Sequence, residues 1–288
     1  MDPYYKYYHY DPSLAASCLF AVLFGLSTTW HSVVLVRRRT WYLIPVVVGG
    51  LFEIVGYAAR AVSHAQAPAL TLGPYVVQTL LLLVAPPLFA ASLYMLLGRI
   101  IVAVDGGDAY SLIKRRWLTK VFVASDVVCF LVQLGGAGLM ASSQSATSTT
   151  GSRIVLAGLL VQIVVFALFV VVAGVFHRRC LRAEMALRAQ DTAQPPPWRR
   201  FLGVLYVASG LVLARNIVRV AEFVEGFNGY IVLHEVFLYV FDAVPMLAAM
   251  GVLNVWHPAR LANDGNVNKA DGGLCISDVE MRNMDGQE

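Results

Sequence analysis

The sequence predicts an all-α integral membrane protein: a bundle of seven transmembrane helices, with the N-terminus outside the cell and the C-terminus in the cytosol. Hydrophobic residues make up 58% of the chain and charged residues only 14%, with a mean hydropathy of +0.65. A soluble protein of this size needs a more charged surface. Apolar stretches recur at the length of about twenty residues that crosses a bilayer as a helix. Basic residues gather in alternate connections, which is typical of cytosolic loops.

The first four spans are bounded by helix-start signals, arginines, glycines and prolines. Ser13 is expected to cap the first helix, which ends before a run of arginines at 37–39. Pro86 and Pro87 should kink the third span or split it into halves, so we interpret them as a hinge. The Ser/Thr/Gln-rich stretch 142–152, which follows the fourth span, is expected to be a flexible loop.

A basic linker is expected at 177–200, before the sixth span. The seven spans are predicted at about residues 14–36, 41–61, 75–104, 118–140, 154–176, 201–223 and 230–255. The basic connections follow the first, third and fifth spans, and this alternation gives the predicted orientation. Residues 1–13 then form an extracellular segment, and 257–288 form a polar, disordered cytosolic tail. We see no cleavable signal peptide at the start of the chain.

Several classes of protein are excluded or disfavoured by missing patterns. No Gly-x-x-x-x-Gly-Lys-Ser/Thr loop is present, so we expect no ATPase activity from this chain. The histidines are scattered over both membrane faces, which disfavours a metal site. No basic patch is interleaved with aromatics, which argues against nucleic-acid binding. We therefore expect neither enzyme activity nor a cofactor.

One stretch in the sixth span places three ionisable side chains on a single helix face. Arg215, Arg219 and Glu222 are spaced i, i+4 and i+7 within an apolar run. An ion at the centre of a membrane helix costs about 2.5–3.5 kcal/mol on insertion scales. These side chains therefore need partners, and other spans supply candidates. The further polar residues placed within the spans are Glu53, Arg60, Gln78, Asp126, Gln133, Gln162, Glu235 and Asp242.

Most of these residues are expected in the outer half of the bundle, with Asp126 nearer the cytosol. The acids outnumber the arginines, so a closed set of salt bridges would leave acids over. A ligand with an ammonium head and an apolar tail would satisfy them. The alternative is a buried polar network that only fixes how the helices pack.

The motifs around these charges resemble a fungal family of lipid-translocating exporters, the resistance-to-aminocholesterol family, which includes sphingoid long-chain base exporters. The resemblance covers roughly residues 4–258. It is carried by Glu53-x-x-Gly56-Tyr57-x-x-Arg60, Tyr75-x-x-Gln78, Ala90-Ala91-x-x-Tyr94, Gly98-Arg99-Ile100, Gln133-x-Gly135-Gly136, Arg215-x-x-x-Arg219-x-x-Glu222 and Glu235-x-x-x-Tyr239-x-x-Asp242. It implies a seven-helix protein that exports or flips amphiphilic lipids, and it adds Tyr57 and Tyr239 to the candidate site. It does not fix the cargo, because related members are tied to other substrates, including porphyrin-like molecules.

The sequence thus favours a translocator of amphiphilic lipids, such as sphingoid long-chain bases or toxic amphiphiles, in the plasma membrane. The alternative is a seven-helix receptor or sensor, or a regulator of lipid-stress responses. The expected partners are membrane lipids or amphiphilic small molecules. If the protein is a receptor, cytosolic regulators are expected as well. The oligomeric state is left open.

Overall fold

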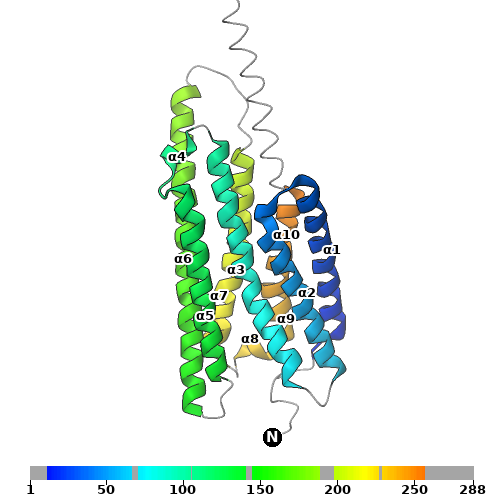
Figure 1. Cartoon of the computed structure of the whole chain (residues 1–288). Coiled ribbons are helices and arrows are strands. Elements are labelled where there is room, and N and C mark those ends of the chain that lie inside the picture. The colour runs from blue at the N-terminus through cyan, green and yellow to red at the C-terminus, as the bar shows by residue number, and fades with distance from the viewer. Residues whose placement is uncertain are drawn as a thin grey trace, which may run out of the picture.

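The computed structural model describes residues 12–66, 71–104, 106–140, 145–188, 198–226 and 229–256. These residues form helices without strands, and seven of the helical segments are long and apolar enough to cross a membrane. The predicted all-α, seven-span fold is confirmed. The spans lie side by side along one common direction (Figure 1). The predictions for residues 1–11 and 257–288 lie outside the described residues, and the orientation across the membrane stays a prediction.

The first two spans are connected by a tight turn. Helix α1 (Leu14–Arg38) begins at Ser13, whose hydroxyl accepts a hydrogen bond from the backbone N–H of Ala16, as the sequence predicted. It ends at Arg39, which adopts a left-handed conformation with φ 51°. A short 3₁₀ turn, η2 (Trp41–Leu43), then leads into α2 (Ile44–Ala65), where Pro45 occupies the first turn.

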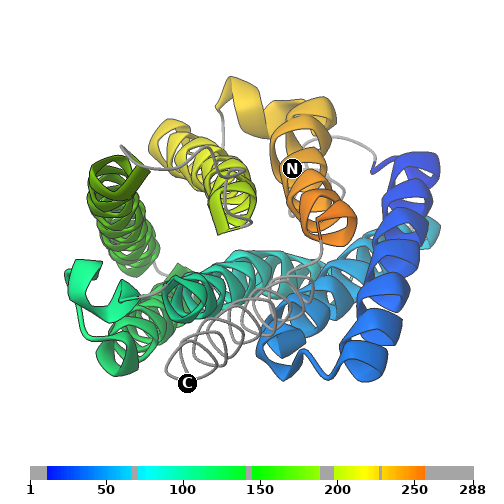
Figure 2. The ribbon, with the colours of Figure 1, turned by 90° about the horizontal axis from the view of Figure 1, so that it is seen from above.

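The third span, α3 (Leu72–Ala103), is the central helix of the bundle. Its apolar window is 67% buried, against 22–50% for the other spans. It packs against α2, α5 and α7, and Figure 2 shows it crossing the middle of the molecule. The helix continues through Pro86 and Pro87 without a break. The predicted split into halves is therefore wrong, while the hinge stays a prediction.

Beyond α3 the chain forms a short helix, α4 (Gly107–Tyr110), and two long antiparallel helices, α5 (Arg115–Met140) and α6 (Ser145–Arg188). The extent of α6 corrects two predictions. The loop expected at 142–152 is helical from Ser145, and the linker expected at 177–200 is helical to Arg188. Serine and threonine only weakly disfavour a helix, and the Arg, Leu, Ala, Glu and Met residues after 177 favour one.

Close backbone approach joins α5 to the first turns of α6. A Cβ on Gly136 would lie 2.8 Å from the carbonyl oxygen of Gly151 and 2.9 Å from the backbone nitrogen of Val155. Of the three glycines at 135, 136 and 138, only Gly136 makes such an approach. Among these three glycines, the small residue that allows close helix packing is therefore Gly136.

We expect Gly136→Ala to destabilise the folded protein by about 1–3 kcal/mol, because the new methyl group must push two backbones apart. Gly135→Ala is the matched control, since a Cβ there meets nothing within 4 Å. Thermal unfolding of both variants in one detergent measures the difference. Equal unfolding temperatures would contradict the close packing of α5 on α6.

The last two spans differ in regularity. Helix α7 (Trp198–Glu225) is continuous, but the helix expected at 230–255 is divided. It consists of α8 (Tyr230–Leu233), α9 (Glu235–Leu238), the π-helical turn η3 (Tyr239–Ala243) and α10 (Val244–Val255). His234 interrupts the helix in an extended conformation, with φ −118° and ψ 112°. The wider π turn ends two residues before Pro245, whose ring would crowd the preceding turn of a regular α-helix.

The outer surface of the bundle is apolar at membrane depth. On α1, Leu19, Val22 and Leu26 are 56–66% exposed although they are large and hydrophobic. In water such a stripe would favour aggregation, whereas lipid chains solvate it. Most of the predicted site residues are instead buried inside the bundle.

Candidate functional site

The three arginines predicted within the membrane each form an ion pair. Arg60 on α2 pairs with Glu235 on α9 at 2.7 Å, and Arg215 on α7 pairs with Asp242 in η3. Arg219 pairs with Glu222, three residues along the same helix, at 2.6 Å. Each arginine expected in the membrane therefore has a carboxylate partner. The pairing satisfies most of the charge that the sequence places in the apolar layer.

The Glu235 carboxylate connects three helices at one end of the bundle. Its two oxygens accept hydrogen bonds from the backbone N–H of Ser13 at 2.8 and 2.9 Å. One oxygen also accepts from Nη2 and Nε of Arg60, at 2.7 and 3.2 Å, and from the hydroxyl of Tyr239 at 3.0 Å. Ser17 on α1 hydrogen-bonds to the same Tyr239 hydroxyl at 2.9 Å. This network fixes the start of α1 against α2 and α9.

Arg215 has a second partner that depends on a proline. Its Nη2 donates to the carbonyl oxygen of Leu82 on α3 at 2.6 Å. In a regular helix that carbonyl would accept from the backbone N–H of residue 86, but residue 86 is a proline and has none. Pro86 thus leaves a buried carbonyl available, and Arg215 uses it. The arginine is only 2% exposed and joins α7 to both α3 and η3.

Glu53 is the acid of this region that makes no salt bridge among the described residues. It is 1% exposed on α2, within electrostatic range of Asp242, Arg215 and Arg219. Six buried polar atoms on α2, α7 and η3 have no hydrogen-bond partner in the described part of the chain. They are Oε2 of Glu53, the hydroxyl of Tyr57, Oγ of Ser209, Oδ1 of Asn216, Nε of Arg219 and Oδ2 of Asp242. Buried polar atoms rarely stay unsatisfied, so such a set points to bound water, a proton or a ligand.

Aromatic rings of α1 lie against two tyrosines of this region. Phe24 stacks on Tyr57 with ring centroids 5.7 Å apart, and Phe20 stacks on Tyr239 at 5.2 Å. Tyr57 and Tyr239 in turn lie 6.0 Å apart. The polar groups beside Tyr57 and Tyr239 therefore lie against aromatic surface. We call the set of Glu53, Tyr57, Arg215 and Asp242 the central polar cluster, because electrostatic interactions connect Asp242 to Glu53 and Tyr57, and Glu53 to Arg215.

Asp126 and the glutamines lie elsewhere in the bundle. The Asp126 carboxylate accepts from the hydroxyl of Tyr94 at 2.8 Å, beside the rings of Phe122 and Phe169. Gln133 on α5 donates to Gln162 on α6 at 2.8 Å, and Gln78 is buried on α3. The predicted site residues therefore fall into separate groups, and no hydrogen bond or ion pair among the described residues joins the central polar cluster to Asp126.

Several residues of the site were not among the predicted site residues. Tyr94 occurs in a quoted family motif, and its hydroxyl is the partner of Asp126. Asn216 follows Arg215 directly and is buried, but an uncharged amide in an apolar run is a weaker sequence signal than an ionisable group. The backbone of Leu82 has no side-chain signal, although a proline four residues later indicates a free carbonyl.

The fold and the site define a multi-pass integral membrane protein with ionised and hydrogen-bonding groups buried between its helices. The chain belongs to the RTA1-like family: the family model described as RTA1 like protein matches residues 46–264. This confirms the family that the sequence motifs resembled.

Curated relatives align over most of the chain. It is 36% identical to protoporphyrin uptake protein 1 of Saccharomyces cerevisiae, over 88% of this chain and 92% of that one. It is 34% identical to protein RTA1 of the same species, over 98% and 96% of the two chains. It is 26% identical to the sphingoid long-chain base transporter RSB1 of a Saccharomyces cerevisiae strain, over 86% and 72%. No solved structure matches the chain.

Proposed function

We propose that this protein moves amphiphilic lipids, such as sphingoid long-chain bases or toxic amphiphiles, across the plasma membrane without hydrolysing ATP itself. The observation that carries the proposal is the central polar cluster, which holds a buried acid without a salt bridge among the described residues. A sphingoid base has an ammonium head and a long apolar tail. Its head would pair with an acid in the cluster, while its tail stays in contact with lipid or apolar side chains.

The relatives support a membrane transport role without fixing the cargo. One is named for the uptake of protoporphyrin and another for the transport of sphingoid long-chain bases. Both named compounds are amphiphiles, but they differ in charge and shape. The acids of the central polar cluster favour the cationic class for this chain.

Within the cluster we assign different roles to the two acids. Asp242 keeps one oxygen in the pair with Arg215, while its other oxygen has no hydrogen-bond partner among the described residues. Glu53 is the acid that would accept the cargo's ammonium group, and the arginine pair would keep the helices in register meanwhile. Release of the ammonium requires the carboxylate to take up a proton or water, so transport is downhill or coupled to protons.

The test follows transbilayer movement in liposomes that contain the purified protein. The cargo pair is a fluorescent long-chain base and its N-acetyl derivative, which has the same tail but no cation. We expect Glu53→Gln to slow movement of the base at least about ten-fold, because a single charged hydrogen bond is worth about 1.5–3 kcal/mol. Movement of the N-acetyl derivative should change much less.

Glu225→Gln is the matched control, because this glutamate is exposed at the end of α7. It should transport both compounds as the unchanged protein does. If neither compound moves faster in liposomes with the unchanged, folded protein than in empty liposomes, direct translocation is wrong. That result would favour the receptor or regulator alternative. If Glu53→Gln moves the base normally, the assignment of Glu53 is wrong.

A further inference from the structure

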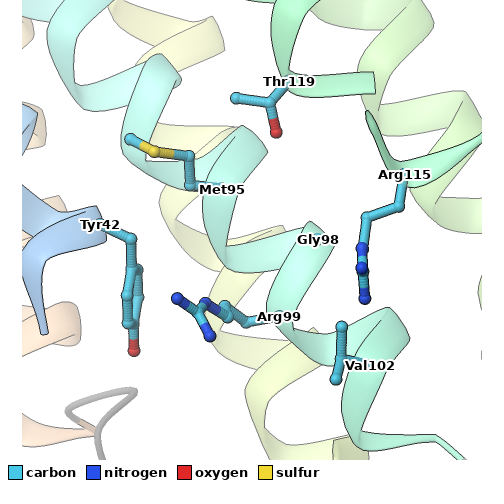
Figure 3. Close-up of a pocket in the computed structure, with 7 residues that line it drawn as sticks. All are labelled: Tyr42, Met95, Gly98, Arg99, Val102, Arg115 and Thr119. Atoms are coloured by element: carbon cyan, nitrogen blue, oxygen red, sulfur yellow. The ribbon is translucent and has the colours of Figure 1, made fainter. Parts of the chain in front are cut away.

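A pocket separate from the central polar cluster opens where α3 ends and α5 begins. It has a volume of about 420 Å³ and is lined by Tyr42, Met95, Gly98, Arg99, Val102, Arg115 and Thr119. Figure 3 shows the side chains of Arg99 and Arg115 on either side of Gly98, with Tyr42 beside Arg99. The lining therefore comes from the turn η2, the last part of α3 and the first part of α5.

Among the described residues, the positive charge of this pocket has no carboxylate partner. Arg99 and Arg115 are both exposed, and neither makes a salt bridge in that part of the chain. The Arg99 guanidinium lies over the ring of Tyr42, 5.1 Å from its centroid, and this cation–π contact favours its position beside the pocket. Two guanidinium groups whose N–H donors have no partner in the described ranges can form a site for a phosphate, whose oxygens they can bind in pairs.

The absence of a side chain at Gly98 leaves room between the two arginines. A Cβ built there would lie 3.8 Å from Cγ of Arg115 and 4.0 Å from the hydroxyl of Thr119, which are ordinary contacts. An alanine therefore fits, whereas a larger side chain would extend between Arg99 and Arg115. The Thr119 hydroxyl adds a further donor to the lining.

The surroundings of the pocket place it at the edge of the membrane. Val102 and Trp117 are 55% and 62% exposed, and an exposed tryptophan is typical of the headgroup region. Arg116 and Lys120 lie on the same end of α5 and are exposed as well. The pocket thus combines two exposed cationic side chains with neighbouring apolar ones, which suits a lipid with an anionic head better than a free ion.

We propose that this pocket binds the phosphate group of an anionic membrane lipid. Arg99 and Arg115 bind the phosphate oxygens, Tyr42 orients Arg99, and the lipid chains lie along the apolar rim near Val102. The site is distinct from the proposed transport path, whose central polar cluster offers acids to a cation. The bound lipid holds η2, α3 and α5 together at the basic end of the bundle.

The test uses the full chain in a neutral detergent and titrates it with phosphatidic acid, with bound lipid counted by native mass spectrometry. We expect one phosphatidic acid per chain, retained in preference to phosphatidylcholine. Arg99→Gln and Arg115→Gln should each weaken binding about ten-fold, the loss expected for one charged hydrogen-bonding group. Arg116→Gln is the matched control, because it removes the same charge next to the pocket without lining it.

Three results would overturn the proposal: equal weakening by Arg116→Gln, no saturation at one lipid, or no preference over phosphatidylcholine. A further titration uses inorganic phosphate alone. If phosphate displaces the lipid at similar concentrations, the pocket is a site for soluble phosphate instead. Gly98→Ala should bind as the unchanged protein does, whereas Gly98→Leu should lose binding while keeping its thermal stability. Normal binding by Gly98→Leu would place the lipid elsewhere.

Discussion

Arg215→Met is expected to destabilise the bundle by about 3–5 kcal/mol, the cost of leaving one member of a buried ion pair without its partner. Asp242 would lose its arginine while remaining 5% exposed, and the carbonyl of Leu82 would lose its donor. Glu53 lies in the same electrostatic environment, so removal of the cation leaves two neighbouring acids facing each other. Thermal unfolding in a single detergent, followed by tryptophan fluorescence, measures the loss.

The double variant Arg215→Met/Asp242→Leu distinguishes the cost of an unpaired charge from the loss of packing. Replacing both members of a buried pair with apolar residues of similar size is often neutral or stabilising. We therefore expect the double variant to recover most of the stability that the single variant loses. A double variant as unstable as Arg215→Met would show that the pair's electrostatics are not what the single substitution disturbs.

The structural role of Pro86 and Pro87 depends on the neighbouring helix α7. From the sequence, Pro86 and Pro87 predict an interruption of the helix, because proline removes a backbone donor. In the structure the helix continues, and the carbonyl freed by Pro86 accepts a hydrogen bond from Arg215. The sequence shows that a carbonyl is free, but which side chain reaches it depends on how α7 crosses α3. Local sequence patterns do not predict how the two helices cross.

The ion pairs illustrate the same limit. The spacing of Arg219 and Glu222 is that of neighbours on one helix, so their contact follows from the sequence alone. Arg215 lies on the same helix, yet it pairs with Asp242 in another span. The long-range pairs Arg215–Asp242 and Arg60–Glu235 need the packing of α7 and α2 against the last span. The sequence identifies the charged residues and the excess of acids, but it does not show which arginine pairs with which acid.

The irregular last span was the hardest part of the fold to predict. The residues at 230–255 are apolar enough for one continuous helix, and only Pro245 signals a disturbance. The break at His234 accompanies packing of its ring on Tyr230, with centroids 4.3 Å apart, which no helical periodicity indicates. The π turn that follows contains Tyr239 and Asp242, both of which are buried. π turns of this kind are frequent at functional sites.

Glu235→Gln is expected to destabilise the protein by about 3 kcal/mol, because a nearly fully buried arginine loses its carboxylate. Arg60 is 1% exposed, and the same carboxylate accepts the backbone N–H of Ser13 at the start of α1. The amide that replaces it has one acceptor oxygen in place of two and brings donors toward donors. Thermal unfolding and hydrogen exchange at the first turn of α1 should both report the loss, since the network holds that turn against α2.

Glu184→Gln is the control with the same chemistry in a different environment. Glu184 pairs with Arg199 at 2.7 Å, but that arginine is 34% exposed. Because that arginine is partly exposed to solvent, the pair is closer to a surface pair, which contributes about 0–1 kcal/mol, so this variant should unfold within a few degrees of the unchanged protein. An equal loss of stability in the two variants would mean that the burial of Arg60 does not determine how much stability is lost. We expect a loss of stability in Glu235→Gln alone, and we expect the molecules of this variant that stay folded to keep moving the long-chain base. This result would assign Glu235 to holding the helices together and would leave Glu53 as the acid for the cargo.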